Sequence, residues 1–196
     1  MQYVEGLNGE TARRRSVFAL AAEALMNNAG LIRLEGVDVR FAPLDKYAMA
    51  LQDDNSRGCV RLSRAHAAVA RGHLWIYAGF VEEVRGEPLA GDVVEVMASD
   101  GRFYARGVYN PASKIRVRIL TFDDEPITEQ FWRKRLAQAL RLRQRIVTGT
   151  TAYRLIYGEA DRLPGLIVDR YDDVLVMQTL SSGMDRRKDI LADLLC

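Results

Sequence analysis

Short apolar runs separated by turn residues dominate the middle of the chain and restrict it to a small β-rich unit. The runs span 59–62, 75–84, 92–97, 102–109 and 115–122. Gly, Pro, Asn or Asp stand at 85–88, 99–102 and 110–113, where the backbone must reverse. Ser63 is a good N-cap for one brief helix, over residues 63–70. Short strands at this spacing with a single small helix predict a compact β-barrel.

The last of these runs alternates charged and apolar residues. Its cations are Lys114, Arg116 and Arg118, and its apolar residues are Ile115, Val117 and Ile119. A period of two places the cations on one face of a strand and the apolar side chains on the other. Like charges side by side on one strand repel, so a polyanion on that face would be stabilising. The pattern predicts either RNA contact or a solvated strand face.

A long amphipathic helix is predicted from Thr128 to about Val147. Its apolar side comprises Trp132, Leu136, Ala139, Leu140, Ile146 and Val147. Its opposite side carries Arg133, Lys134, Arg141 and Arg145. No acidic residue occurs between Gln130 and Gly158, so nothing local neutralises these cations. An RNA backbone would bind them by releasing condensed counterions. A solvated or protein-paired helix is the alternative.

The C-terminal part predicts a hairpin and one further helix. The runs 166–171 and 174–180 flank Asp172-Asp173, a short turn that suits a hairpin. A helix follows at 185–195. Alone, a hairpin and one helix leave a strand edge unpaired, so we expect further sequence to complete this domain.

Two carboxylates and one aromatic residue have two interpretations each. Glu159 and Asp161 could form an acid–base pair, but Arg154 and Arg162 are close in sequence, so ion pairing and turn geometry explain them better. For Trp75 we favour a place in the core over a role as a base-stacking platform. His73 has no second ligand nearby, so no metal site is predicted.

Residues 1–57 form an N-terminal extension of unknown role. Helices are predicted at 11–28 and 44–51, and a strand at 31–41. The cluster Arg13-Arg14-Arg15 could contact RNA, but we favour a solvated helix end as its explanation.

Composition limits the class of protein. The net charge of +2 does not by itself indicate nucleic acid, but residues 126–196 hold 12 basic and 9 acidic residues, a local surplus. Cys59 and Cys196 form no disulfide or metal pattern. The apolar run 17–26 is too short to span a bilayer and contains Glu23. These features predict a cytoplasmic protein without membrane or metal partners.

Three further motifs follow one another along the chain. They are Arg71-Gly72-His73-Leu74-Trp75-Ile76-Tyr77-Ala78-Gly79, then Gly107-Val108-Tyr109-Asn110-Pro111-Ala112-Ser113-Lys114-Ile115, and finally Arg154-Leu155-Ile156, Gly158-Glu159, Asp161, Leu163-Pro164-Gly165 and Asp169-Arg170. In this order they resemble the motifs of the large-subunit (23S) ribosomal RNA cytosine-C5 methyltransferases. Two residues depart from that family: Leu74 stands where it usually has Pro, and Arg162 where it usually has Gly.

The resemblance implies an α+β fold with a small PUA-like RNA-binding β-barrel at 58–125. A partial α/β (strand–strand–helix) central domain would follow at 126–196. Family members use S-adenosylmethionine, but this sequence has no Gly-x-Gly turn and no βαβα series, so no catalytic or cofactor-binding residue is assigned and no cofactor is expected on this chain. The resemblance therefore implies the RNA-engaging front part of an enzyme acting on ribosomal RNA. A stand-alone PUA-type RNA-binding module and a protein-interaction scaffold are the alternatives.

Overall fold

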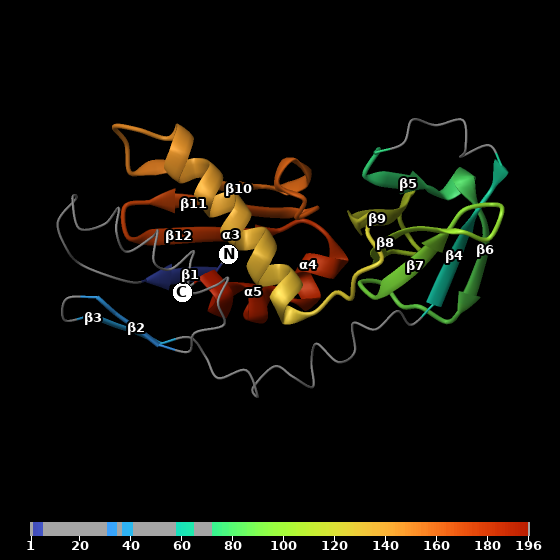
Figure 1. Cartoon of the computed structure of the whole chain (residues 1–196), viewed down its shortest axis with the longest axis horizontal. Helices are drawn as coiled ribbons and strands as arrows, with labels where there is room; N and C mark the ends of the chain where they lie inside the picture. The colour runs from blue at the N-terminus through green and yellow to red at the C-terminus, as the bar shows by residue number, and fades with distance from the viewer. Residues whose placement is uncertain (1, 6–30, 35–36, 41–57, 65–71, 196) are drawn as a thin grey trace. The chain divides into compact units, whose positions relative to one another are not determined.

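The computed structural model describes residues 2–5, 31–34, 37–40, 58–64 and 72–195 (Figure 1). Backbone contacts divide the chain into two compact units. The first contains residues 1–48, 129–180 and 188–196, and the second contains 49–128 and 181–187. The helices predicted at 11–28 and 44–51, the Arg13-Arg14-Arg15 cluster and most of the helix at 63–70 lie outside the described residues.

The second unit is built on a six-stranded sheet. Its strands are β4 (Gly58–Leu62), β5 (Trp75–Tyr77), β6 (Val81–Gly86), β7 (Val93–Met97), β8 (Phe103–Tyr109) and β9 (Ile115–Thr121). Their order is β5-β9-β8-β7-β4-β6, antiparallel throughout except for β4 against β7. A 3₁₀ turn, η3 (Ala78–Phe80), divides the predicted run 75–84 into β5 and β6. The sheet curls, as expected for a PUA-like β unit.

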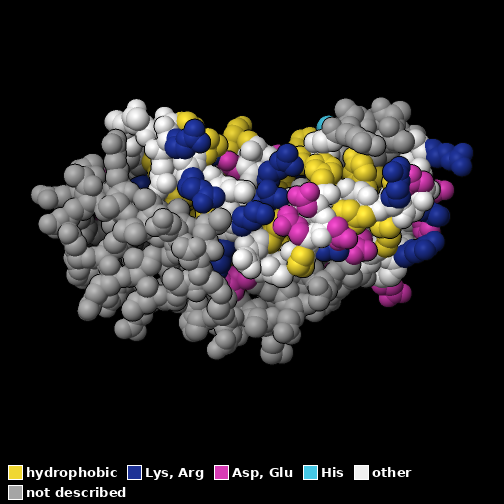
Figure 2. Space-filling model, in the orientation of Figure 1, with side chains coloured by type: hydrophobic (Ala, Val, Ile, Leu, Met, Phe, Trp, Pro, Cys, Tyr) yellow, Lys and Arg dark blue, Asp and Glu magenta, His cyan; other side chains and the backbone are white. Residues whose placement is uncertain are grey.

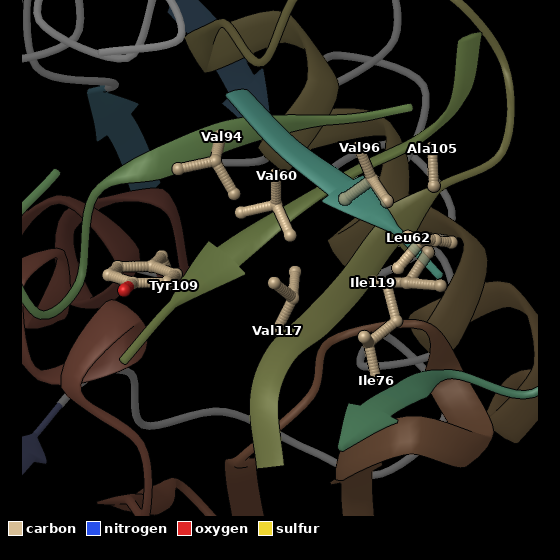
Figure 3. Packing of buried hydrophobic residues seen from close by; sticks show 9 residues of the cluster. All are labelled: Val60, Leu62, Ile76, Val94, Val96, Ala105, Tyr109, Val117 and Ile119. Atoms are coloured by element: carbon tan, nitrogen blue, oxygen red, sulfur yellow. The ribbon is translucent and has the colours of Figure 1, made fainter. Parts of the chain in front are cut away.

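One apolar cluster fills the inside of the curled sheet (Figure 3). It consists of Val60, Leu62, Ile76, Val94, Val96, Ala105, Tyr109, Val117 and Ile119, which point toward one another from β4, β5, β7, β8 and β9. Burying a Val or Ile side chain contributes roughly 1.5–3 kcal/mol, so this cluster accounts for much of the unit's stability. Val117 and Ile119 lie in it, which confirms the inward side of the alternation predicted for β9.

A short C-terminal helix, α4 (Ser182–Arg186), also belongs to this unit. The Ser181 hydroxyl caps it by accepting a hydrogen bond from the Met184 N–H. Gly183 allows the close approach to β8, because a Cβ there would lie 2.3 Å from Val108 Cγ1. The helix predicted at 185–195 is confirmed from Lys188 onward, but residues 185 and 186 belong to α4 instead. The chain leaves helical geometry at Arg187 (φ −107°, ψ 8°), and α5 (Lys188–Leu195) forms separately.

Two arginines hold α4 to the turn before β7. The buried Arg187 guanidinium donates to Gly91 O (2.9 Å) and Gly183 O (2.8 Å). Arg186 pairs with the buried Asp92 carboxylate, which also accepts from the Leu89 N–H (2.7 Å). Residues about 95 positions apart in sequence are thus joined by charge-assisted hydrogen bonds.

The first unit contains a four-stranded antiparallel sheet of order β1-β12-β11-β10. Its strands are β1 (Gln2–Glu5), β10 (Ala152–Tyr157), β11 (Leu166–Tyr171) and β12 (Val174–Thr179). β11 and β12 form the predicted hairpin, and Asp172 takes a positive φ of 50° at its turn. The expected unpaired hairpin edge is wrong, because β1 pairs with β12 and β10 with β11.

Helices lie over this sheet, and β-strands at 31–40 form a separate two-stranded sheet. Figure 1 shows α3 (Glu129–Ile146) lying obliquely across the sheet, with α5 beside it. The bounds of α3 agree with the prediction within two residues. The strand predicted at 31–41 is instead two short antiparallel strands, β2 (Leu31–Leu34) and β3 (Val37–Arg40).

Candidate nucleic-acid interface

The cations predicted on β9 lie on the outer side of the curled sheet. Lys114, just before the strand, is exposed, and Arg116 and Arg118 are half-buried while Val117 between them is fully buried. The Arg116 guanidinium donates to the carbonyls of Asn110 and Pro111, which holds it beside its own turn. Lys114 and Arg116 have no ion pair within the described parts of the chain.

Other basic residues of this unit are neutralised by carboxylates. Arg61 and Arg85 both pair with Glu83, and Arg102 pairs with Asp100. Hydrogen bonding with Arg85 lowers the pKa of Glu83, and hydrogen bonding with Arg102 lowers that of Asp100. Figure 2 shows basic side chains interleaved with acidic and hydrophobic ones over this unit.

Trp75 does not occupy the place predicted for it. Along β5 it is Ile76 that enters the core, at 0% exposed, so Trp75 and Tyr77 on either side point outward. Trp75 is half-buried and Tyr77 is 40% exposed. The prediction of a core tryptophan is wrong because 74–77 is apolar throughout, and a run without polar residues cannot show which face is inside.

Trp75 lies next to a β9 cation. In the antiparallel register Trp75 is opposite Arg118, whose Cζ lies 5.5 Å from the centroid of a Trp75 ring. This distance is typical of a cation–π contact. The His73 ring lies 5.9 Å from that of Trp75 and 6.2 Å from that of Tyr77, and its Nδ1 accepts from the Trp75 N–H (3.1 Å). Tyr77 was not singled out from the sequence, although its spacing of two from Trp75 is a usable signal.

Three of the four cations predicted on α3 are exposed: Lys134, Arg141 and Arg145. Arg133 is not, being 6% exposed, so its predicted place on a solvated face is wrong. Its guanidinium pairs with the Glu129 carboxylate one turn earlier, with Nη2 at 2.5 Å and Nε at 2.6 Å. Glu129 lies immediately before the acid-free segment that begins at Gln130. Because the two residues are four apart on one helix, its carboxylate can reach the Arg133 guanidinium. For Arg141 and Arg145 the described residues provide no ion pair.

Other α3 residues also differ from the predicted helical wheel. Ile146, placed on the apolar side, is 63% exposed at the helix end. Arg143, which was assigned no role, is 9% exposed and pairs with Asp161. Ion pairing at Asp161 is thereby confirmed, but its partner is Arg143 rather than Arg154 or Arg162. Arg154 instead binds Asp169 at 2.8 and 3.0 Å, and that hydrogen bonding raises the pKa of Arg154.

The described residues give little support for metal or nucleophilic chemistry. In ranges 58–64 and 72–195 no three His, Cys, Asp or Glu side chains gather to hold a metal ion. No described helix is both long and apolar enough to cross a membrane. Burial, followed by the Glu95 carboxylate, raises the pKa of the Cys59 thiol, so it is a poor nucleophile.

Comparison with known proteins places this geometry in context. Residues 60–122 match the family model of the PUA-like domain. Ribosomal RNA large subunit methyltransferase I of Shewanella amazonensis is 42% identical over 128 residues, which cover 64% of this chain and 32% of that protein. The protein of the same name from Vibrio campbellii is 42% identical over 130 residues, 65% of this chain and 33% of that protein. The chain is homologous to these proteins and spans about a third of their length.

Solved structures agree at the level of the fold. A candidate SAM-dependent methyltransferase from Streptococcus mutans superposes with a TM-score of 0.60 at 16% identity, covering 70% of this chain and 36% of that one. A candidate methyltransferase complexed with SAH gives a TM-score of 0.57 at 18% identity, with the same coverage. The chain therefore carries a PUA-like domain, and its homologues are ribosomal RNA large subunit methyltransferases.

Proposed function

We propose that this chain is the RNA-engaging portion of an S-adenosylmethionine-dependent large-subunit ribosomal RNA (cytosine-C5) methyltransferase. The homology to ribosomal RNA large subunit methyltransferase I, at 42% identity over 128 residues, carries this proposal. The chain would act in the cytoplasm and hold ribosomal RNA. The rest of such a protein, about two thirds of the length of these relatives, would perform methyl transfer.

Cations on each of the two units give the proposal a physical basis. In the PUA-like unit, Lys114, Arg116 and Arg118 line the outer face of β9 and its approach. In the other unit, Lys134, Arg141 and Arg145 are exposed on α3. Each cation that reaches a phosphate releases condensed counterions, which favours binding at moderate salt. Arg133 is withdrawn from this set because Glu129 already neutralises it.

S-adenosylmethionine would supply the methyl group in the complete enzyme. We assign none of the described residues to it, and catalysis is not attributed to this chain. The role of the chain is to position RNA, which depends on phosphate contacts that fix orientation without reading sequence. Binding without methyl transfer is therefore the activity expected of the 196-residue chain.

Fluorescence anisotropy with labelled large-subunit ribosomal RNA fragments tests the proposal. The logarithm of the association constant should fall linearly with the logarithm of salt concentration, by about 0.7–0.9 for every phosphate contacted. An affinity indifferent to salt, or no binding at low salt, would contradict it. Arg102→Gln is a matched control, because Arg102 is exposed but already paired with Asp100 at 2.7 Å. That variant should bind as the parent chain does.

A further inference from the structure

The last two turns of α3 expose two aliphatic side chains next to two cations. Leu142 is 44% exposed and Ile146 is 63% exposed. Arg141 and Arg145, beside them on the helix, are exposed as well. Residues three or four apart are neighbours on a helix surface, so these four side chains form one continuous area. We call this area the α3 patch.

The α3 patch is carried by a firmly held part of the helix. Arg143, within the same two turns, is buried and forms an ion pair with Asp161. Its Nε also donates to Arg154 O (3.1 Å), which ties this end of α3 to β10. Side chains on a restrained helix keep a fixed spacing, so less conformational entropy is lost when a ligand binds them.

The aliphatic pair is more informative than the two cations. Cations in the last turn of a helix are stabilised by the helix dipole, so Arg145 has a structural explanation that needs no ligand. Leu142 and Ile146 gain nothing from the dipole, and their exposure to water is unfavourable. Single exposed apolar residues are common on proteins, but neighbouring ones between cations indicate a surface that another molecule covers.

The charges around the aliphatic pair select the kind of molecule. Within the described parts of the chain, Arg141 and Arg145 have no ion pair. No acidic residue occurs from 130 to 158 in the sequence. The covering molecule must therefore bring its own negative groups together with apolar surface. RNA provides both, as phosphates and as the faces of its ribose rings.

The shape of the α3 patch favours helical RNA. An α-helix is about 10–12 Å across and presents a convex surface. The minor groove of A-form RNA is wide and shallow and displays 2′-hydroxyl groups, so such a surface can lie in it. The minor groove of B-form DNA is only about 6 Å wide and excludes a helix. Gln138, exposed one turn before Leu142, can exchange hydrogen bonds with a 2′-hydroxyl.

We propose that the α3 patch lies in the minor groove of duplex RNA, with Leu142 and Ile146 packed against ribose rings. Arg141 and Arg145 bind the phosphates that border the groove. This inference rests on the proposed function and deepens it, because it names the form of RNA that α3 prefers. The cations attract any nucleic acid, and the aliphatic pair distinguishes duplex RNA from duplex DNA.

The test compares two duplexes of the same length, charge and base sequence. One is an RNA duplex of about 16 base pairs, and the other is the matching DNA duplex with deoxyuridine in place of thymidine. Leu142→Ala/Ile146→Ala should weaken binding of the RNA duplex about 5- to 30-fold, because the exposed parts of both side chains no longer become buried. Binding of the DNA duplex should change less than about two-fold. The salt dependence should stay the same for both, since no charge is removed.

Leu180→Ala is the matched control. Leu180 is 65% exposed directly after β12, where its N–H donates to Gly165 O (2.7 Å), and it belongs to the same unit as α3. This variant should bind the RNA duplex as the parent chain does. Alanine has the highest helix propensity, so α3 should stay folded in the double variant, and circular dichroism verifies this.

The possible outcomes separate this inference from the proposed function. Equal losses on the two duplexes, or no loss on RNA, would overturn the minor-groove contact while leaving salt-dependent RNA binding intact. Sedimentation velocity tests the competing occupant. A dimer of the parent chain that the double variant fails to form, with RNA affinity unchanged, would assign the α3 patch to a second copy and overturn the inference. Absence of salt-dependent binding to RNA would overturn the proposed function and the inference together.

Discussion

The Arg143 guanidinium on α3 donates two hydrogen bonds to the Asp161 carboxylate, at 2.5 Å to Oδ1 and 2.7 Å to Oδ2. Arg143 Nε also donates to Arg154 O (3.1 Å), and Asp161 Oδ2 accepts from the Tyr157 N–H (2.6 Å). Both side chains are about nine-tenths buried or more. This pair therefore joins α3 to β10 and to η4 (Gly158–Asp161) within one unit.

Arg143→Lys should destabilise this unit markedly. Lysine cannot reproduce the planar fork that binds both carboxylate oxygens and a carbonyl together. It would leave Asp161 under-satisfied in a buried place, so we expect the free energy of unfolding to fall by about 2–4 kcal/mol. Urea denaturation followed by circular dichroism measures this. Arg141→Lys, two residues earlier and exposed, should stay within about 0.5 kcal/mol of the parent. Equal effects of the two substitutions would contradict the assignment.

Gly183→Ala should loosen the attachment of α4. The added Cβ would lie 2.3 Å from Val108 Cγ1 and 2.7 Å from Cγ2, and a β-branched side chain has little freedom to move aside. Overpacking of this kind costs about 1–3 kcal/mol, more than the helix propensity of alanine restores. Thermal denaturation gives the change. Gly79→Ala is the control, since nothing lies within 4 Å of its Cβ. In a Val108→Ala background the penalty of Gly183→Ala should shrink, and an unchanged penalty would rule out this contact.

Arg162→Gly should stabilise the chain. Arg162 ends η4 in the left-handed region, at φ 59° and ψ 30°, where a side chain is strained and glycine is not. Removing that strain, less the backbone freedom that glycine gains when unfolded, should raise the free energy of unfolding by about 0.5–1 kcal/mol. Gly165→Ala gives the opposite substitution at a φ of 85° and should lower it. Chemical denaturation measures the free energy of unfolding of both variants. A lower value for Arg162→Gly than for the parent chain would contradict the explanation by backbone strain.

Cys59 should react slowly with thiol reagents at neutral pH. Burial and the Glu95 carboxylate both disfavour the thiolate, so the raised pKa leaves less of the reactive form than an unfolded cysteine has at the same pH. Alkylation by iodoacetamide in a Cys196→Ser background isolates this thiol. Its rate should increase as the pH is raised through and beyond the ordinary cysteine range, and should rise at neutral pH in denaturant. Equal rates in the folded and unfolded chain at neutral pH would contradict the prediction.

Local periodicity predicted the elements whose two sides differ in polarity. β9 follows its alternation of cations and apolar residues, and α3 begins and ends within two residues of the expected positions. β10 was missed because its register shifts between Arg154 and Ile156, so Leu155 and Ile156 are both buried and no period of two remains. The pairing of β1 with β12 joins residues about 175 positions apart, and no local pattern reports it.

The candidate interface was predictable only in part. A helical wheel predicts which cations of a helix face outward. It cannot predict their ion pairs with acidic residues that lie outside that stretch of sequence. Glu129 neutralises Arg133 from one turn away, and Asp161 neutralises Arg143 from 18 residues away. Which residues of β5 enter the core depends on the orientation of the strand, and an uninterrupted apolar run does not encode that orientation.

The most direct measurement compares the salt dependence of RNA binding between the parent chain and the Arg141→Gln/Arg145→Gln variant. We propose that these exposed guanidiniums bind phosphates. The slope of the logarithm of the association constant against the logarithm of salt concentration should therefore become shallower by roughly 1.4–1.8, for two lost phosphate contacts. Arg102→Gln, paired with Asp100, should leave the slope as it is. Parallel lines for the parent chain and the double variant would contradict a role for α3 in holding RNA.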